Sequence, residues 1–350
     1  MTEESIRAAL ATVKYPGFSR DIVSFGLVKG IEISAEKATV NLEIATREPD
    51  LPRKIYTEAA AAVAGLGGEI EIDITIKDPP AGPEGNAGLG AGTSSIPGVK
   101  TIIAVASGKG GVGKSTVASN LAVSLSHLPG APSVGLCDCD LYGPSITTMF
   151  GTDEELRGTA DNEIIPAERY GIKLVSMGFL LDDRSPVIVR GPLATRYTQQ
   201  FLRQCQWGEL DYLVLDLPPG TGDIQLTIVQ SVALDGAVIV STPQEVALID
   251  ARKATSMFGK VNVPILGLIE NMSYFECPSD GVRYPIFGEG GGAREAEHLG
   301  VPLLGQIPIE IATRESGDDG KPISHPDHGE SQSRKIFEEI AEKLAVRLQN

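Results

Sequence analysis

Residues 108–116 contain the residue types that bind phosphate in nucleotide-hydrolysing proteins. They read GKGGVGKST, which fits the pattern of a glycine, any four residues, a glycine, a lysine and a serine or threonine. Glycines let the backbone wrap an anion and aim its N–H groups at the phosphates. Lys114 should reach the β- and γ-phosphates, and Ser115 should ligate Mg²⁺. We therefore expect a nucleoside triphosphate site made of Gly108, Lys109, Gly110, Gly111, Val112, Gly113, Lys114, Ser115 and Thr116.

Carboxylates follow two other apolar runs. Asp138 and Asp140 come after residues 134–137, and Asp216 ends the run that starts at residue 212. Beside a phosphate loop, a carboxylate can orient a water or hold the Mg²⁺ shell near the γ-phosphate. This pattern predicts Asp138 and Asp140 as catalytic and Asp216 as the carboxylate on the metal side. The alternative is that each of the first two caps the next turn.

Two later polar residues also follow apolar runs. Asp223 comes after the stiff segment PPGTG, so it either senses the γ-phosphate with that turn or caps the helix predicted over residues 224–232. Asn271 follows the run 265–270, and its amide can hydrogen-bond a purine edge. The turn at residues 308–310 is expected to flank the same base.

These residues need a scaffold that gathers strand ends. Apolar strands alternate with helices from residue 99 to 350, which is typical of a doubly wound, mostly parallel α/β sheet. A helix is predicted over residues 115–125, directly after the glycine loop. Ligands bind such sheets at the carboxyl ends of the strands. The predicted strands are residues 102–106, 134–137, 212–215, 236–241, 265–270 and 303–307.

The N-terminal part reads as a separate small α/β domain over residues 1–78. Its predicted order is a helix (4–13), two strands (22–33 and 38–44), a helix (54–66) and a strand (69–76). Residues 69–76 alternate strictly, which indicates one buried and one solvated face. The domain carries no visible catalytic cluster, so we interpret it as an accessory or docking module. Residues 79–98 are rich in Pro and Gly and are predicted to be a linker.

Composition limits the partners. The 350 residues carry a formal net charge of −16, which disfavours nonspecific binding to nucleic acid or to an anionic membrane. No apolar run approaches the roughly 20 residues of a membrane span, and the first ten residues do not resemble a secretory signal. Residues 334–348 are amphipathic with a polar face of mixed charge, so they are expected to pack on the sheet. We therefore expect a cytoplasmic protein without nucleic acid or membrane partners.

The four cysteines do not form a disulfide scaffold. Cys137 and Cys139 point to the same face of a strand and are expected to pack in the core, and Cys205 is expected to be structural. Cys277 lies in the segment CPSD, where it is either a loop thiol or a metal ligand.

The complete motif set resembles one family. A lysine directly after the first glycine, Lys109, is similar to the deviant Walker A NTPases, which include partitioning and septum-placing ATPases, nitrogenase iron protein and arsenite ATPase. Within that group, DLYGPS, DLPPGTGD, ENMSYF, IFGEGGG and DDGKPI resemble the Mrp/ApbC family of ATP-binding iron–sulfur cluster carriers. Residues 1–78 resemble the SufT-like domain often fused to bacterial members.

This resemblance implies a slow, Mg²⁺-dependent ATP hydrolase that works as a homodimer. Lys109 would reach across the dimer to the partner's nucleotide, and Asp138 and Asp140 would be the switch carboxylates. Nucleotide would clamp the two subunits, and hydrolysis would reset them. The partners implied are cluster-assembly proteins and the apo iron–sulfur proteins that receive the cluster.

The cluster ligands depart from the family pattern. Typical members carry Cys-x-x-Cys after the NMS segment, and two such pairs across a homodimer ligate one cluster. Here the second cysteine position is Asp280. A dimer therefore offers only two thiolates at this site, one Cys277 from each chain, whereas a 4Fe–4S cluster usually takes four. Asp280 is then an unusual oxygen ligand, or the cluster is held transiently.

Three rival functions remain at this stage. A positioning ATPase of the partitioning or septum type would need a basic DNA surface or a membrane helix. A nucleotide-gated reductase similar to nitrogenase iron protein would need a stable bridging cluster. A third alternative is a family ATPase that has lost stable cluster binding.

Overall fold

The computed structural model describes residues 2–15, 21–24, 26–34, 37–45, 51–77, 94–152, 154, 156–159, 163–179 and 191–349. The chain divides into two compact units; among the described residues, the first ends at residue 77 and the second begins at residue 94. Most of the predicted linker lies outside the described residues. Its last residues belong to the second unit, where Ser94 forms a bridge with Val232 and Ile96 is buried.

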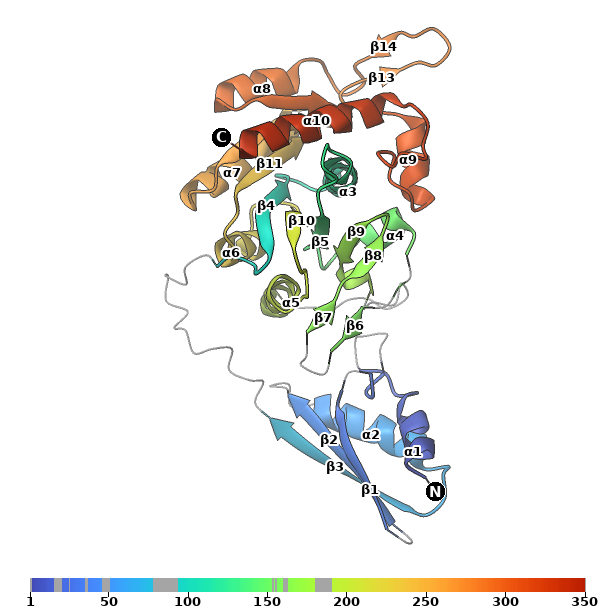
Figure 1. The fold of residues 1–350 in the computed structure, drawn as a ribbon. Helices are drawn as coiled ribbons and strands as arrows, with labels where there is room; N and C mark the ends of the chain where they lie inside the picture. Colours follow the sequence, from blue (N-terminus) through green and yellow to red (C-terminus); the bar gives the residue numbers. More distant parts are fainter. Residues whose placement is uncertain are drawn as a thin grey trace. The chain divides into compact units, whose positions relative to one another are not determined.

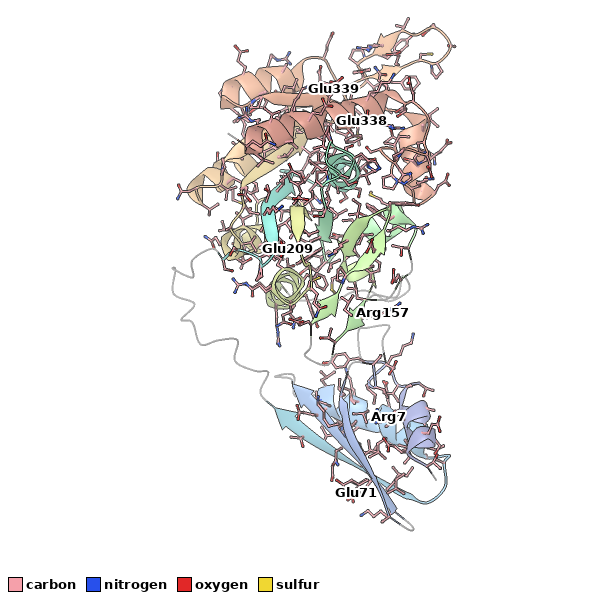
Figure 2. The ribbon with its side chains drawn as sticks, viewed as in Figure 1. Arg7, Glu71, Arg157, Glu209, Glu338 and Glu339 are labelled. Carbon is pink, nitrogen blue, oxygen red and sulfur yellow. The ribbon has the colours of Figure 1, made fainter. Side chains whose placement is uncertain are left out.

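The N-terminal unit has the predicted order of elements. β2 pairs antiparallel with β1 and parallel with β3, and α1 and α2 pack on this three-stranded sheet. The shared core includes Ile6, Leu42 and Ile55. Arg7 and Glu71, labelled in Figure 2, form exposed ion pairs with other charged residues. The elements are α1 (Glu3–Leu10), β1 (Val28–Ile33), β2 (Lys37–Ala45), α2 (Leu51–Val63) and β3 (Glu69–Lys77).

Three elements of this unit have other bounds than predicted: α1 ends at Leu10 instead of residue 13, α2 spans Leu51–Val63 instead of 54–66, and the first strand differs most. The first strand was expected from residue 22, but β1 begins at Val28. The Asp21 carboxylate accepts hydrogen bonds from the backbone N–H groups of Val23 and Ser24, at 2.9 and 2.8 Å. Such bonds between a side chain and a nearby backbone stabilise a turn in competition with a strand.

The second unit contains an eight-stranded sheet (Figure 1). Its order is β15-β12-β11-β4-β10-β5-β9-β8, and every neighbouring pair is parallel except β8–β9. This confirms the mostly parallel α/β fold. The strands are β4 (Val99–Ala106), β5 (Val134–Asp138), β8 (Ala167–Arg169), β9 (Ile172–Val175), β10 (Leu210–Asp216), β11 (Gly236–Ser241), β12 (Ile265–Glu270) and β15 (Leu303–Gln306).

Helices cover both faces of the sheet. α3 packs against β5 and β10, α7 against β11 and α8 against β12. The chain moves along the sheet in one direction through α3 and in the other through α6, α7 and α8, so the right-handed rule for such crossovers puts α3 on the opposite face from these three helices. α10 packs beside α3 and β15, and its residues Glu338 and Glu339 (Figure 2) lie outside its buried face. The amphipathic C-terminal segment therefore packs on the second unit, as predicted. The helices are α3 (Lys114–Ser126), α4 (Ile146–Phe150), α5 (Gly191–Arg203), α6 (Asp223–Ser231), α7 (Glu245–Lys260), α8 (Gly291–Leu299), α9 (Ile311–Asp318) and α10 (Gln332–Leu348).

Five short elements complete this unit. A 3₁₀ turn spans Met177–Phe179, and two hairpins pair β6 (Arg157–Gly158) with β7 (Ile164–Ile165) and β13 (Phe275–Glu276) with β14 (Arg283–Tyr284). Among the described helices, none is both long and apolar enough to cross a bilayer.

The packing of α10 predicts a stability difference between two neighbouring substitutions. Leu344 is fully buried, whereas 61% of Val346 is exposed. Leu344→Ala should lower the free energy of unfolding by about 2–5 kcal/mol because it leaves a cavity, and Val346→Ala by no more than about 0.5 kcal/mol. Urea unfolding monitored by the fluorescence of Trp207, the single tryptophan and a residue of this unit, measures both. Equal losses would contradict the packing.

Candidate functional site

The carboxyl ends of three neighbouring strands bring the predicted site residues together. β10 lies between β4 and β5, and its last residue, Asp216, pairs in register with Val105 on one side and Asp138 on the other. The phosphate loop follows β4 directly. One edge of the sheet thus holds the loop and two carboxylates, as the sequence predicted.

The phosphate loop ends in an uncapped helix. Gly113 is the N-cap of α3, has a left-handed backbone with φ of +80°, and offers no side chain to bond the first N–H groups. Those groups remain available to an anion at the positive end of the helix dipole. At the other end of the loop, a Cβ on Gly108 would collide with the backbone of Asp250 in α7. Glycine is therefore required at both ends.

A buried ion pair lies beneath the loop. Lys114 Nζ is 2.5 Å from Oδ1 of Asp216, and the two side chains are 6% and 0% exposed. Burial raises the pKa of Asp216, and the charge of Lys114 opposes that rise. Oδ2 of Asp216 is buried and has no hydrogen-bond partner among the described residues. A free carboxylate oxygen beside Ser115 fits the hard oxygen donors that Mg²⁺ prefers.

Asp138 is surrounded by donors. Its carboxylate accepts hydrogen bonds from the N–H groups of Asp140 at 3.0 Å and Ser145 at 3.1 Å and from the Ser176 hydroxyl at 3.0 Å, and a longer one of 3.4 Å from Ile146 N. Burial, with the charge of Asp216, raises the pKa of Asp138 to about 7. This geometry matches the alternative in which Asp138 caps the next turn, because Ser145 and Ile146 begin α4. Its catalytic role stays a prediction.

Asp140 is more open. Its Oδ1 accepts the N–H groups of Tyr142 and Gly143 at 3.3 and 3.2 Å. It lines a groove of about 860 Å³ together with Pro218, Pro219 and Asp223. A carboxylate at this groove has room for a water, and its catalytic role also stays a prediction. The N-cap interpretation of Asp223 is wrong: Gly222 is the N-cap of α6, and Asp223 is the first helical residue.

Asn271 contacts the phosphate loop itself. Its amide nitrogen donates to the carbonyl oxygen of Val112 at 2.9 Å, and the side chain is buried. Sequence reasoning proposed a purine partner and missed this contact, which joins residues 159 positions apart. The purine contact remains a prediction, and among the described residues no donor bonds to the side-chain oxygen of Asn271 that would make it.

Sequence reasoning also missed Glu270. This fully buried carboxylate accepts hydrogen bonds from Ser273 Oγ at 2.6 Å, from Gln306 Nε2 at 2.7 Å and from the N–H of Gly292. An acidic residue at the end of an apolar strand was the available signal. Glu270 fixes the turn that leaves β12.

The cysteines occupy two kinds of environment. Cys137 and Cys139 are buried with their sulfurs 3.9 Å apart, as expected for core residues on one face. A hydrogen bond with Cys139, together with burial, raises the pKa of Cys137, and burial raises the pKa of Cys205 to about 12. Cys137 and Cys205 are therefore poor nucleophiles and ligands.

Cys277 is different because it lies in the turn of the β13–β14 hairpin. Its Sγ is 3.0 Å from Oγ of Ser279, and this contact lowers its pKa. Asp280 accepts the Val282 N–H at 2.9 Å and the Tyr284 hydroxyl at 3.4 Å. Within the described part of one chain, no three His, Cys, Asp or Glu side chains gather to hold a metal ion. Cys277 as a residue is partly exposed and lines a groove of about 630 Å³.

These features define a class of protein. A buried strand leads into a glycine-rich loop, and an uncapped helix follows the loop. A lysine and a strand-end aspartate form an ion pair beneath it. This arrangement, on a mostly parallel sheet, is that of a P-loop nucleotide-binding protein.

The chain belongs to the NUBPL iron-transfer P-loop NTPase family, which it matches over residues 98–345; residues 3–74 match the iron-sulfur cluster assembly protein family. This is the Mrp/ApbC group that the motifs indicate. The chain is 42% identical to the iron-sulfur cluster carrier protein of Deinococcus radiodurans over 98% of this chain and 96% of that protein. It is 54% identical to the iron-sulfur cluster carrier protein of Aquifex aeolicus over 71% of this chain and 68% of that one.

A solved structure shares the nucleotide-binding fold. The nucleotide-binding protein of Archaeoglobus fulgidus, in complex with ADP, is 40% identical to this chain with a TM-score of 0.56. The similarity covers 64% of this chain and 87% of that protein.

Substitutions of Lys114 and Lys109 are predicted to have different effects on ATP binding and hydrolysis. Lys114→Ala should abolish measurable ATP binding, because the loop loses its countercharge to the phosphates and Asp216 is left as a buried, unpaired anion. Lys109 is half-buried and forms no ion pair with another described residue, so Lys109→Ala should keep part of the binding and lose hydrolysis. Titration calorimetry and phosphate release measure the two effects.

The control for these variants is Lys100→Ala, which removes an exposed lysine paired with Asp211 at 2.8 Å. It should change neither binding nor hydrolysis. Equal loss of binding in Lys114→Ala and Lys109→Ala would contradict the assignment of Lys109 to a partner's nucleotide.

The Cys277–Ser279 contact predicts a pH profile. Because the contact lowers the pKa of Cys277, its thiolate should form at lower pH than that of an ordinary cysteine, and its alkylation should be faster at neutral pH. Ser279→Ala should move the midpoint of the iodoacetamide profile to higher pH. Mass spectrometry of the Cys277 peptide follows the reaction, with the slow peptide of Cys205 as internal control. An unchanged midpoint would show that Ser279 does not stabilise the thiolate.

Proposed function

We propose that this protein binds and hydrolyses ATP and carries an iron–sulfur cluster to apoproteins. The observation that carries the proposal is its 42% identity to an iron-sulfur cluster carrier protein along almost the full length of both chains. The hairpin with its activated thiol supports it, because a thiolate is the ligand that iron–sulfur clusters prefer. The net charge of −16 argues against a positioning ATPase on DNA or on an anionic membrane.

In this proposal, ATP hydrolysis at the nucleotide site supplies the energy for carrying the cluster. Mg²⁺ would be held by Ser115 and by the free oxygen of Asp216, where it offsets charge on the phosphates. Lys114 then leaves Asp216 for the β- and γ-phosphates, so the cation loses one anionic partner and gains another. Asp140 is the carboxylate with room to orient the attacking water.

A homodimer explains the position of Lys109. This lysine follows the first glycine of the loop but is not paired with the carboxylates below it. In the proposed dimer it contacts the partner's nucleotide, so ATP binds the two chains together and hydrolysis releases them. The same pairing brings two Cys277 thiolates to one cluster.

The cargo site is the part that departs from the family pattern. Two thiolates are half of what a 4Fe–4S cluster usually takes, and the Asp280 carboxylate is already bonded to the Val282 N–H. This observation favours a cluster that is held briefly and passed on quickly. It also supports a second candidate, an ATPase of this family without stable cluster binding.

Anaerobic reconstitution with iron and sulfide separates these candidates. Cys277→Ser should lose most of the bound iron because it removes the thiolates of the site. Asp280→Cys restores four thiolates per dimer and should raise both cluster occupancy and lifetime in air. Absorbance and iron count per chain measure the outcome, with Cys205→Ser as the matched control. If wild type, Cys277→Ser and Asp280→Cys bind the same iron, the hairpin is not the cargo site.

A further inference from the structure

One amide joins the phosphate loop to the segment that leads to the hairpin. Asn271 follows β12, a strand separated from β4 by β11. Its backbone N–H donates to the Ser241 carbonyl at 2.8 Å, and its side-chain nitrogen donates to the Val112 carbonyl at 2.9 Å. The backbone of Asn271 is therefore fixed, and its side chain is hydrogen-bonded to Val112 in the middle of the phosphate loop.

The hydrogen bond to the Val112 carbonyl orients a backbone N–H group that can bind phosphate. In a planar trans peptide, the C=O and N–H point in opposite directions. When Asn271 holds the carbonyl of Val112, the N–H of the same peptide, which belongs to Gly113, is turned away from Asn271. The amide and the Met272 side chain also pack against Gly113, where a Cβ would collide with the amide nitrogen.

The effect works in both directions. An anion that accepts a hydrogen bond from the Gly113 N–H polarises this peptide and makes the Val112 carbonyl a stronger acceptor, because linked hydrogen bonds reinforce one another. Occupancy of the loop thus tightens the bond to Asn271. By linkage, a firm Asn271 improves the loop for phosphate by the same factor.

The segment after Asn271 is short and held at several points. Met272 has a left-handed backbone with φ of +55°, a conformation that a non-glycine residue keeps only when its surroundings impose it. Ser273 is tied by its N–H to the Ile307 carbonyl at 2.9 Å and by its hydroxyl to Glu270. The segment therefore has little freedom to absorb a shift of Asn271.

The far end of the segment is the hairpin. The Arg283 guanidinium of β14 lies 4.5 Å from the centre of the Tyr274 ring and pairs with Glu276 at 2.9 Å. Five residues lie between Asn271 and Cys277. These contacts form a continuous route from the Val112 carbonyl to the thiol.

We propose that Asn271 is a positioning residue that couples occupancy of the phosphate loop to the conformation of the Cys277 hairpin. Its biological purpose rests on the proposed carrier function, since the hairpin is where the cargo would bind. In this coupling, phosphate in the loop tightens the Asn271–Val112 bond, and the tighter bond orders the hairpin. A purine is not needed for the effect.

Hydrogen exchange of the hairpin tests the coupling without iron. The probes are Mg²⁺·ATP and Mg²⁺·tripolyphosphate, which carries the phosphates without a base, each saturating by calorimetry. The reporters are the hairpin amides of Cys277, which donates to the Val282 carbonyl, and Gly281, which donates to the Cys277 carbonyl. Both probes should slow their exchange about two- to tenfold, the range of one neutral hydrogen bond. A protein concentration at which light scattering reports a monomer excludes shielding by a second copy.

Two variants at Asn271 and one control make the test specific. Asn271→Ala and the near-isosteric Asn271→Asp remove the donor and should abolish the slowing of exchange at saturation. Asn120→Ala is the matched control: Asn120 is buried and donates to the Thr116 carbonyl at the same distance, 2.9 Å, but leads to no hairpin. It should retain the response. Trp207 fluorescence verifies that each variant is folded.

Several results would overturn the coupling. These are an unchanged wild-type hairpin with tripolyphosphate, a response limited to ATP, a response retained in both Asn271 variants, or equal loss in Asn120→Ala. None of them bears on whether the hairpin binds iron. Conversely, a failed cluster reconstitution would leave this measurement intact.

Discussion

The buried pair of Lys114 and Asp216 is the constraint on which the nucleotide site depends. Removing a cation and an anion from water costs several kcal/mol for each ion, and their mutual attraction repays this only in good geometry. The geometry is set by β4 and β10, whose register puts the loop next to Asp216. In the proposed function, nucleotide binding would be an exchange of partners: phosphate would replace Asp216 as the partner of Lys114, and Mg²⁺ would replace Lys114 as the partner of Asp216.

A second carboxylate must be accommodated next to this pair. Asp138 lies in register with Asp216, and two anions this close oppose each other's ionisation. The structure surrounds Asp138 with backbone and hydroxyl donors, which favour its charged form, while burial and Asp216 raise its pKa to about 7. Its protonation therefore depends on the charge that arrives beside it.

The sequence predicted the parts of the fold that depend on interactions between residues close together in the chain. The glycine loop, the helix after it and the central strands carry their signals in consecutive residues, and all formed as expected. β8 and β9 were missed because segments of three and four residues show too little periodicity. The contacts of Asn271 and Glu270 were missed for another reason. They depend on which strands become neighbours, and nothing near residue 271 encodes the proximity of Val112.

The β13–β14 hairpin has a different relation to folding from the strands beside it. Its turn is exposed from Pro278 onward, and exposed substitutions typically change the free energy of unfolding by no more than about 0.5 kcal/mol. Residues in the turn can therefore be replaced while the sheet and the phosphate loop stay intact. In evolutionary terms, the residues of the hairpin turn can vary while the nucleotide-binding fold stays the same. Selection can alter the residue at a position such as 280 without first restoring lost stability elsewhere.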